Sequence, residues 1–116
     1  MKVIHNKLIP FGKHYYAINL FGVVFAKCRL SPQELNHEYI HTLQQQELLF
    51  AGFYIIYILE WIARMIQYRS LFKAYAHICF EQEAYCKMND LQYAEHRKPF
   101  AWRKYLYARK KSTNAR

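Results

Sequence analysis

The chain has 116 residues, which is enough for one hydrophobic core but excludes a separate substrate-binding domain. Its formal net charge of +9 favours an anionic partner, and the two obvious classes are membrane headgroups and nucleic acid. Aromatic residues make up 18% of the chain, with eleven Tyr among them, which is typical of a membrane interface or a substrate groove.

The N-terminal segment and the cysteines indicate a cytoplasmic protein. Residues 1–7 are mixed in polarity and lack the apolar stretch of a secretory signal. Three cysteines cannot all pair within one chain, and they show no C-x-x-C spacing, so we expect reduced thiols. Cys79 and Cys86 are two helical turns apart, and we interpret them as small buried hydrophobes on one helix face in preference to metal ligands.

Residues 1–30 form the predicted β region of a single domain that covers residues 1–116. The region is rich in Val, Ile, Phe and Tyr, and Pro10, Gly12 and Gly22 are turn signals. The strongest strand candidate spans residues 17–27. We therefore expect a β-hairpin or small sheet here.

Residues 31–96 form the predicted helical region. Ser31 has the features of an N-cap, because Pro32 follows at the first helical position and Glu34 completes a capping box. After Pro32, only Gly52 interrupts the helical pattern as far as about residue 90. The fold class is therefore α+β: a short N-terminal hairpin or sheet followed by a bundle of about three helices. The first is expected from 32 to about 50 and the third from 70 to about 89.

Residues 48–59 form an unbroken run of twelve uncharged, mostly apolar residues. The run is shorter than the roughly 20 residues that a transmembrane helix needs. It could enter a membrane without crossing it, or it could be buried in the core or in a homo-oligomer interface. The sequence leaves these alternatives open.

The C-terminal tail, residues 97–116, carries eight Lys or Arg and no acidic residue. Trp102, Tyr105 and Tyr107 alternate with these charges. Such a tail fits binding to anionic headgroups, and it also fits stacking on single-stranded nucleic acid. Nucleic acid is the less favoured partner, because the chain has no recognised nucleic-acid-binding motif.

One motif indicates a specific chemistry: His37, Glu38 and His41 form H-E-x-x-H. On a helix, the i,i+4 spacing directs both imidazoles to one face, where they can bind one metal ion. The alternative is a surface helix with two solvated histidines, or a core that buries His41. Catalytic zinc takes three protein ligands, and the expected third helix offers the carboxylates of Glu81 and Glu83.

Taken together, these residues resemble the gluzincin metallopeptidases, in particular the HtpX-like branch and the single-domain minigluzincins. Their third ligand belongs to a downstream E-x-x-[AS]-D element, here Glu81-Gln82-Glu83-Ala84-Tyr85. The resemblance implies Zn²⁺ bound by His37, His41 and Glu81, with Glu38 as the general base that hydrolyses a peptide or protein substrate. Tyr85 replaces the usual Asp, so orientation of a ligand histidine must be weaker or come from another residue.

The layout also resembles small bacterial proteins with H-E-x-I-H-x-x-Q-Q before a hydrophobic hairpin. Gln44 and Gln45 occupy the two Gln positions, and each could support a ligand or be a solvated helix residue. His77 lies four residues before Glu81, so it could join or replace that ligand, or simply form an i,i+4 contact with it. Tyr75, Tyr85 and His77 are candidates, by position only, for stabilising an oxyanion.

The leading hypothesis is therefore a cytoplasmic, membrane-associated zinc metallopeptidase. An exposed strand edge within residues 17–27 could hold an extended peptide by strand addition. The second hypothesis is a catalytically silent module that binds an anionic membrane surface. The third is a small basic nucleic-acid-binding protein.

Overall fold

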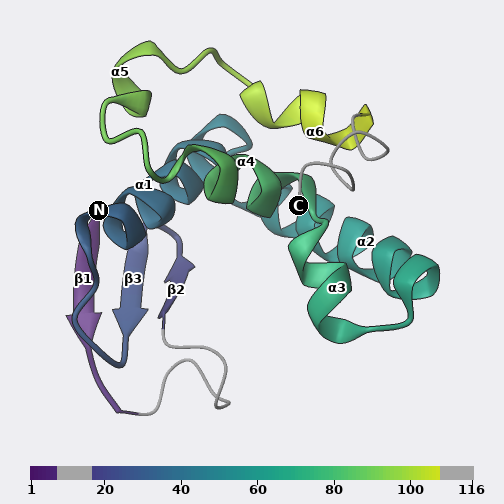
Figure 1. The fold of residues 1–116 in the computed structure, drawn as a ribbon, viewed down its shortest axis with the longest axis horizontal. Helices are drawn as coiled ribbons and strands as arrows, with labels where there is room; N and C mark the ends of the chain where they lie inside the picture. Colours follow the sequence, from purple (N-terminus) through teal and green to yellow (C-terminus); the bar gives the residue numbers. More distant parts are fainter. Residues whose placement is uncertain (8–16, 108–116) are drawn as a thin grey trace.

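The computed structural model describes residues 1–7 and 17–107, apart from the side chain of Tyr107. The predicted turn signals Pro10 and Gly12, and residues 108–116 of the tail, lie outside this part of the chain. The described residues confirm the α+β fold class: a small N-terminal sheet is followed by helices (Figure 1).

The sheet has three short strands, and β3 (Val23–Ala26) lies between β1 (Lys2–His5) and β2 (Ala17–Leu20). β1 is parallel to β3, whereas β2 is antiparallel to it. Alternate residues of β3, Val24 and Ala26, are fully buried, as the two-residue period of a strand requires. Because β3 is the central strand, β2 is an edge strand of the described sheet.

The predicted strand at residues 17–27 is divided into β2 and β3 by a two-residue turn. Phe21 and Gly22 have φ angles of 55° and 84°, the left-handed conformation that tight hairpin turns require. The strain at Phe21 is offset because its N–H donates to the Tyr54 hydroxyl at 2.8 Å. The Gly22 N–H donates to Oε1 of Gln45 at 3.0 Å. The helical region thus fixes the hairpin in place.

Helix α1 (Pro32–Glu47) begins with the predicted capping box. The Ser31 hydroxyl accepts from the Glu34 N–H at 3.1 Å, and the Glu34 carboxylate accepts from the Ser31 N–H at 2.7 Å. The chain then bends by 110° into α2 (Ala51–Tyr68). The bend forms because two residues between the helices have positive φ angles.

The apolar run at residues 48–59 supplies both this bend and the first half of α2. α2 buries Phe53 but leaves Ile58 and Leu59 exposed, so the run is only partly a core segment. No single helix in the described residues is long and apolar enough to span a bilayer, whereas α1 and α2 together, as a bent pair, meet that test of length and composition.

The helix predicted from residue 70 to about 89 is two helices, α3 (Leu71–Ala76) and α4 (Cys79–Lys87). His77 ends the first, and Ile78 has an extended backbone (φ −66°, ψ 134°). The sequence has no Gly or Pro here that would predict a break in the helix. Instead, Ile78 is fully buried, so tertiary packing overrides the continuous helical pattern.

The elements stack in layers (Figure 1). α1 contacts β2 on one side and α4 on another, and α4 is covered in turn by the C-terminal segments. These segments are α5 (Tyr93–His96), the 3₁₀ helix η1 (Ala101–Arg103) and α6 (Lys104–Tyr107). The first part of the predicted basic tail is therefore folded onto the core.

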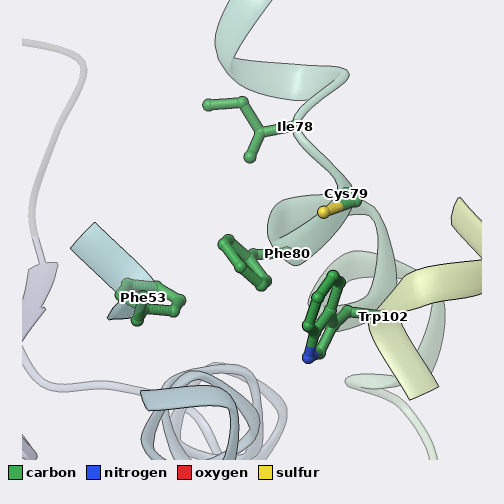
Figure 2. Close-up of a cluster of buried hydrophobic side chains, with 5 residues drawn as sticks. All are labelled: Phe53, Ile78, Cys79, Phe80 and Trp102. Atoms are coloured by element: carbon green, nitrogen blue, oxygen red, sulfur yellow. The ribbon is translucent and has the colours of Figure 1, made fainter. Parts of the chain in front are cut away.

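Figure 2 shows how this tail enters the core. The ring centroids of Trp102 and Phe80 are 5.0 Å apart, and those of Phe80 and Phe53 of α2 are 4.5 Å apart. Trp102 is buried, and Tyr105 packs against the same cluster. Aromatic packing in the core thus occupies the Trp102 ring, which is not free to contact headgroups or bases in this fold.

All three cysteines are free. Cys79 is fully buried, as expected, but Cys86 is exposed, so the predicted shared buried face is wrong. The reason is that the other elements cover α4 only as far as Ala84, and Cys86 lies in the turn beyond.

We expect Trp102→Ala to lower the free energy of unfolding by roughly 3–5 kcal/mol, because it removes a buried aromatic side chain and leaves a cavity. Phe72→Ala is the matched control, since Phe72 is 66% exposed. Urea denaturation of both variants measures the difference. Equal midpoints would show that the tail does not pack on the core.

Candidate metal centre

The two helices that pack in the centre of the molecule bring three ligand atoms together. His37 and His41 lie one turn apart on α1, and Glu81 lies in the first turn of α4. The two Nε2 atoms are 3.2 Å apart, and Glu81 Oε1 is 3.4 Å from His37 Nε2 and 3.1 Å from His41 Nε2. All three side chains are buried. This group could hold a metal ion.

The geometry fits a small tetrahedral cation. Zinc bonds of 2.0–2.2 Å at tetrahedral angles place neighbouring ligand atoms about 3.3 Å apart, and the three distances here are 3.1–3.4 Å. Two imidazoles and one carboxylate are also a donor set that suits zinc and leaves a fourth position open. The structure therefore brings together the three ligands predicted from the sequence.

Gln44 fixes the tautomer of His41. Its Nε2 donates to the Phe80 carbonyl and to Glu83 Oε1, both at 3.0 Å, so its Oε1 must face His41. That Oε1 lies 2.8 Å from His41 Nδ1, which must therefore carry a hydrogen. The other ring nitrogen, Nε2, is the one directed at His37 and Glu81. Gln44 thus prepares His41 as a ligand through Nε2.

Gln44 is held in turn by a buried group of charges. Both oxygens of Glu83 accept from the Arg97 guanidinium, at 2.6 and 3.1 Å, and Arg97 also makes two hydrogen bonds to Glu47 at 2.8 and 3.1 Å. The Tyr93 hydroxyl donates to Glu83 at 2.7 Å. Glu83 therefore lies outside the group of His37, His41 and Glu81, and it anchors the Gln44 amide that orients His41. Sequence patterns missed Arg97, since its partners are 14 and 50 residues away.

Gln45 is also fully buried. Its Nε2 donates to the Asn19 carbonyl at 3.3 Å, while its Oε1 accepts from the Gly22 N–H. The alternative that Gln44 and Gln45 are solvated helix residues is therefore wrong. Gln44 supports a ligand, and Gln45 ties β2 to the helix that carries the ligands.

Without a metal ion, the site is an ion pair. Burial lowers the pKa of His41, but the charge of Glu81 and its hydrogen bond outweigh burial and raise the pKa to about 9. Burial raises the pKa of Glu81, but the charge of His41 and hydrogen bonds from both histidines hold it well below its usual range. At neutral pH, His41 therefore carries a proton on each ring nitrogen. A metal ion must displace the one on Nε2.

The second oxygen of Glu81 accepts from the Tyr57 hydroxyl at 2.7 Å. This bond orients the carboxylate so that Oε1 faces the histidines. Tyr57 comes from α2, and nothing in the sequence distinguishes it from its aromatic neighbours. Only the tertiary packing of α2 against α4 brings the Tyr57 hydroxyl to Glu81.

His37 has no comparable support. Its Nδ1 is buried and has no hydrogen-bond partner in the described part of the chain. The Tyr85 ring packs edge-on against the imidazole at 4.4 Å, while the Tyr85 hydroxyl lies 3.2 Å from that of Tyr75. The weaker orientation of a ligand histidine predicted from Tyr85 thus concerns His37, whereas His41 is oriented by Gln44.

His77 does not join the ligands. It caps the end of α3, its Nδ1 is 2.7 Å from the Lys73 carbonyl, and its ring stacks on Tyr68 at 4.2 Å. The expected i,i+4 relation to Glu81 fails because the chain breaks between α3 and α4. By contrast, Tyr75 faces the site, and burial raises the pKa of its hydroxyl, which therefore stays protonated.

The ligands open into a cavity of about 650 Å³. Glu38 lines it beside both histidines, and burial raises the pKa of this carboxyl, against the opposing charges of His41 and His37. The four residues of β2 form one wall of the cavity. Mostly apolar or aromatic side chains from the helices form another wall: Phe53, Tyr54, Tyr57, Ile58, Trp61, Leu71 and Tyr75.

No protein-family model, curated protein or solved structure matches the chain. Any functional conclusion therefore depends on the chemistry and geometry of this site.

We expect Gln44→Ala to weaken zinc binding about 10- to 100-fold, because loss of the oriented Nδ1–H contact frees the His41 ring. Gln46→Ala on the same helix is the matched control, since Gln46 is exposed. Competition with a chromophoric chelator measures both affinities. Equal affinities would mean that His41 is held in place without Gln44.

We also expect zinc affinity to depend on pH. Because the pKa of metal-free His41 is about 9, the apparent affinity should rise about tenfold per pH unit between pH 6 and 8, with one proton released for each ion bound. Chelator competition at three pH values, corrected for protonation of the chelator, gives the slope. A flat profile would show that His41 is already deprotonated in the metal-free protein.

Proposed function

We propose that the protein is a zinc-dependent peptide hydrolase. The observation that carries this proposal is the buried set of His37, His41 and Glu81, which lines one cavity together with the carboxyl of Glu38 and the edge strand β2. A purely structural metal site would use four protein ligands. The described residues supply three candidate ligands to this group, and the carboxyl of Glu38 is not one of these ligands.

Zinc held by these three residues would lower the pKa of a bound water to about 7 and would polarise the carbonyl that is attacked. Glu38 acts as the general base: it accepts a proton from the attacking water and returns it to the leaving amine. Its raised pKa makes it a better proton acceptor than an exposed carboxylate, while it remains next to the two histidines. Tyr75, protonated at the cavity wall, is the candidate hydrogen-bond donor to the carbonyl oxygen.

The substrate is proposed to bind as an extended peptide along β2. Among the described strands, β2 pairs with β3 alone, and it lines the cavity. The Asn19 side chain fixes the distance between β2 and the metal-binding helix, since its Nδ2 donates to the Glu38 carbonyl at 2.8 Å and to the Thr42 hydroxyl at 2.7 Å. An added strand would place one of its amides beside Glu38.

The two other hypotheses receive less support from the site. A catalytically silent membrane module has no need of three converging ligands, although an exposed apolar face on α2 is compatible with it. A nucleic-acid-binding role depends on the aromatic residues of the tail, and the Trp102 ring is buried in the core. Nucleic acid is thus the weakest candidate partner.

The test combines metal content with activity. We expect about one zinc per chain by elemental analysis of the native protein, and loss of that zinc in His41→Ala and in Glu81→Ala. Glu38→Gln should keep the metal but lower the cleavage rate of a mixed peptide pool, followed by mass spectrometry, by about 10²- to 10⁴-fold.

Glu34→Gln is the matched control for Glu38→Gln, because Glu34 lies one turn earlier on α1 and caps the helix outside the cavity. The Glu34→Gln variant should cleave the peptide pool at the native rate. A native protein that binds no zinc would exclude the metal site. A zinc-loaded Glu38→Gln variant that cleaves as fast as the native chain would exclude the proposed general base.

A further inference from the structure

α2 and α3 present a continuous apolar surface, which we call the α2–α3 face. Its residues on α2 recur at helical spacing, so they share one side of the helix. They continue onto the first turn of α3, at the end of the molecule farthest from the sheet in Figure 1. All are exposed: Ile55, Ile58, Leu59, Ile62, Ile66, Leu71 and Phe72.

This exposure is not a consequence of loose packing. The opposite side of α2 packs against the rest of the molecule: Phe53 and Tyr57 contact the core, and Arg64 is buried in an ion pair with Glu60 at 3.0 Å. Glu60 also accepts from the Cys79 N–H at 3.0 Å. Ile66 nevertheless remains 75% exposed and Leu59 63%. Water-exposed apolar surface of this kind marks an interaction site.

The charges around the face are positive. Between residues 51 and 78 the only acidic residue is Glu60, which is paired with Arg64. Arg69 and Lys73, by contrast, are exposed on either side of the two apolar residues that begin α3. An apolar face with cations at its border is complementary to an anionic bilayer, whose headgroups attract Lys and Arg while apolar side chains enter the acyl boundary.

A second copy of the chain fits the face less well. In a two-fold dimer the same surface meets itself, and the α2–α3 face contains no free acidic residue to pair with Arg69 or Lys73 of the other copy. Such an interface would desolvate these cations without compensation. The charge pattern therefore favours lipid over self-association.

We propose that the α2–α3 face docks the protein on an anionic membrane surface, with the helices lying in the interface without spanning it. Ile58 and Leu71 belong both to this face and to the lining of the metal-site cavity. Docking therefore brings the cavity next to the bilayer surface. The proposal does not depend on hydrolytic activity, since lipid binding requires neither zinc nor Glu38.

Flotation of the 116-residue chain with phosphatidylcholine vesicles containing phosphatidylglycerol tests the proposal. We expect binding to these vesicles and weaker binding to pure phosphatidylcholine. The Ile66→Ser/Phe72→Ser double variant leaves the net charge unchanged and should reduce partitioning about tenfold or more, because two large apolar side chains no longer enter the lipid. Arg69→Gln/Lys73→Gln should reduce it about fivefold for each charge removed.

Leu91→Ser is the matched control, because Leu91 is 49% exposed and lies two residues before α5, outside the α2–α3 face, and the variant should bind like the native chain. Leu59→Ser/Ile62→Ser provides a second double variant if the first does not fold, as judged by circular dichroism. Vesicle binding that survives both apolar double variants would overturn the proposal, since net positive charge alone would explain it. A dimer that both variants dissociate, with no vesicle binding, would assign the face to self-association instead.

Discussion

The contact between α1 and α4 is the constraint on which the site depends, and the buried amide of Gln44 is its centre. On α1, Gln44 orients His41; across the interface, it binds the Phe80 carbonyl and Glu83. Because Phe80 is next to the third ligand in the chain, one amide sets both the rotation of the imidazole and the position of the carboxylate. A shift of α4 along α1 would break these hydrogen bonds and, at the same time, move Glu81 away from the two histidines.

Stability alone does not account for the charges behind Gln44. Burying an ion pair costs desolvation energy that the pair often fails to recover, so an apolar replacement is frequently as stable. Glu83 is fully buried and accepts from Arg97, Tyr93 and Gln44. A charged anchor, unlike an apolar one, specifies a single orientation of the amide that it holds. This group is thus better explained by the geometry of the candidate metal site than by the stability of the fold.

The sequence predicted what depends on short-range patterns. The capping box at Ser31 and the helix with His37 and His41 follow from residues within a few positions of one another, and the choice of Glu81 as a candidate ligand follows from the resemblance of residues 81–85 to a short family motif. The break at Ile78, the burial of Trp102 and the role of Tyr57 could not be predicted in this way. Each depends on a contact between distant segments, where core packing overrides the local helical or amphipathic pattern.

One helix, α2, links the features of the molecule that a local pattern could not connect. Its inner side supplies Tyr57 to Glu81 and Phe53 to the core, while its outer side carries the exposed Ile66. The 110° bend after α1 makes both possible, because a straight continuation would carry α2 away from α4. In the proposed docked state, the same helix would contact Glu81 on its inner side and lipid on its outer side, so the orientation of the cavity would follow that of the membrane. A peptide bound along β2 in that docked state would lie beside the membrane surface, since Ile58 and Leu71 belong both to the cavity and to the α2–α3 face.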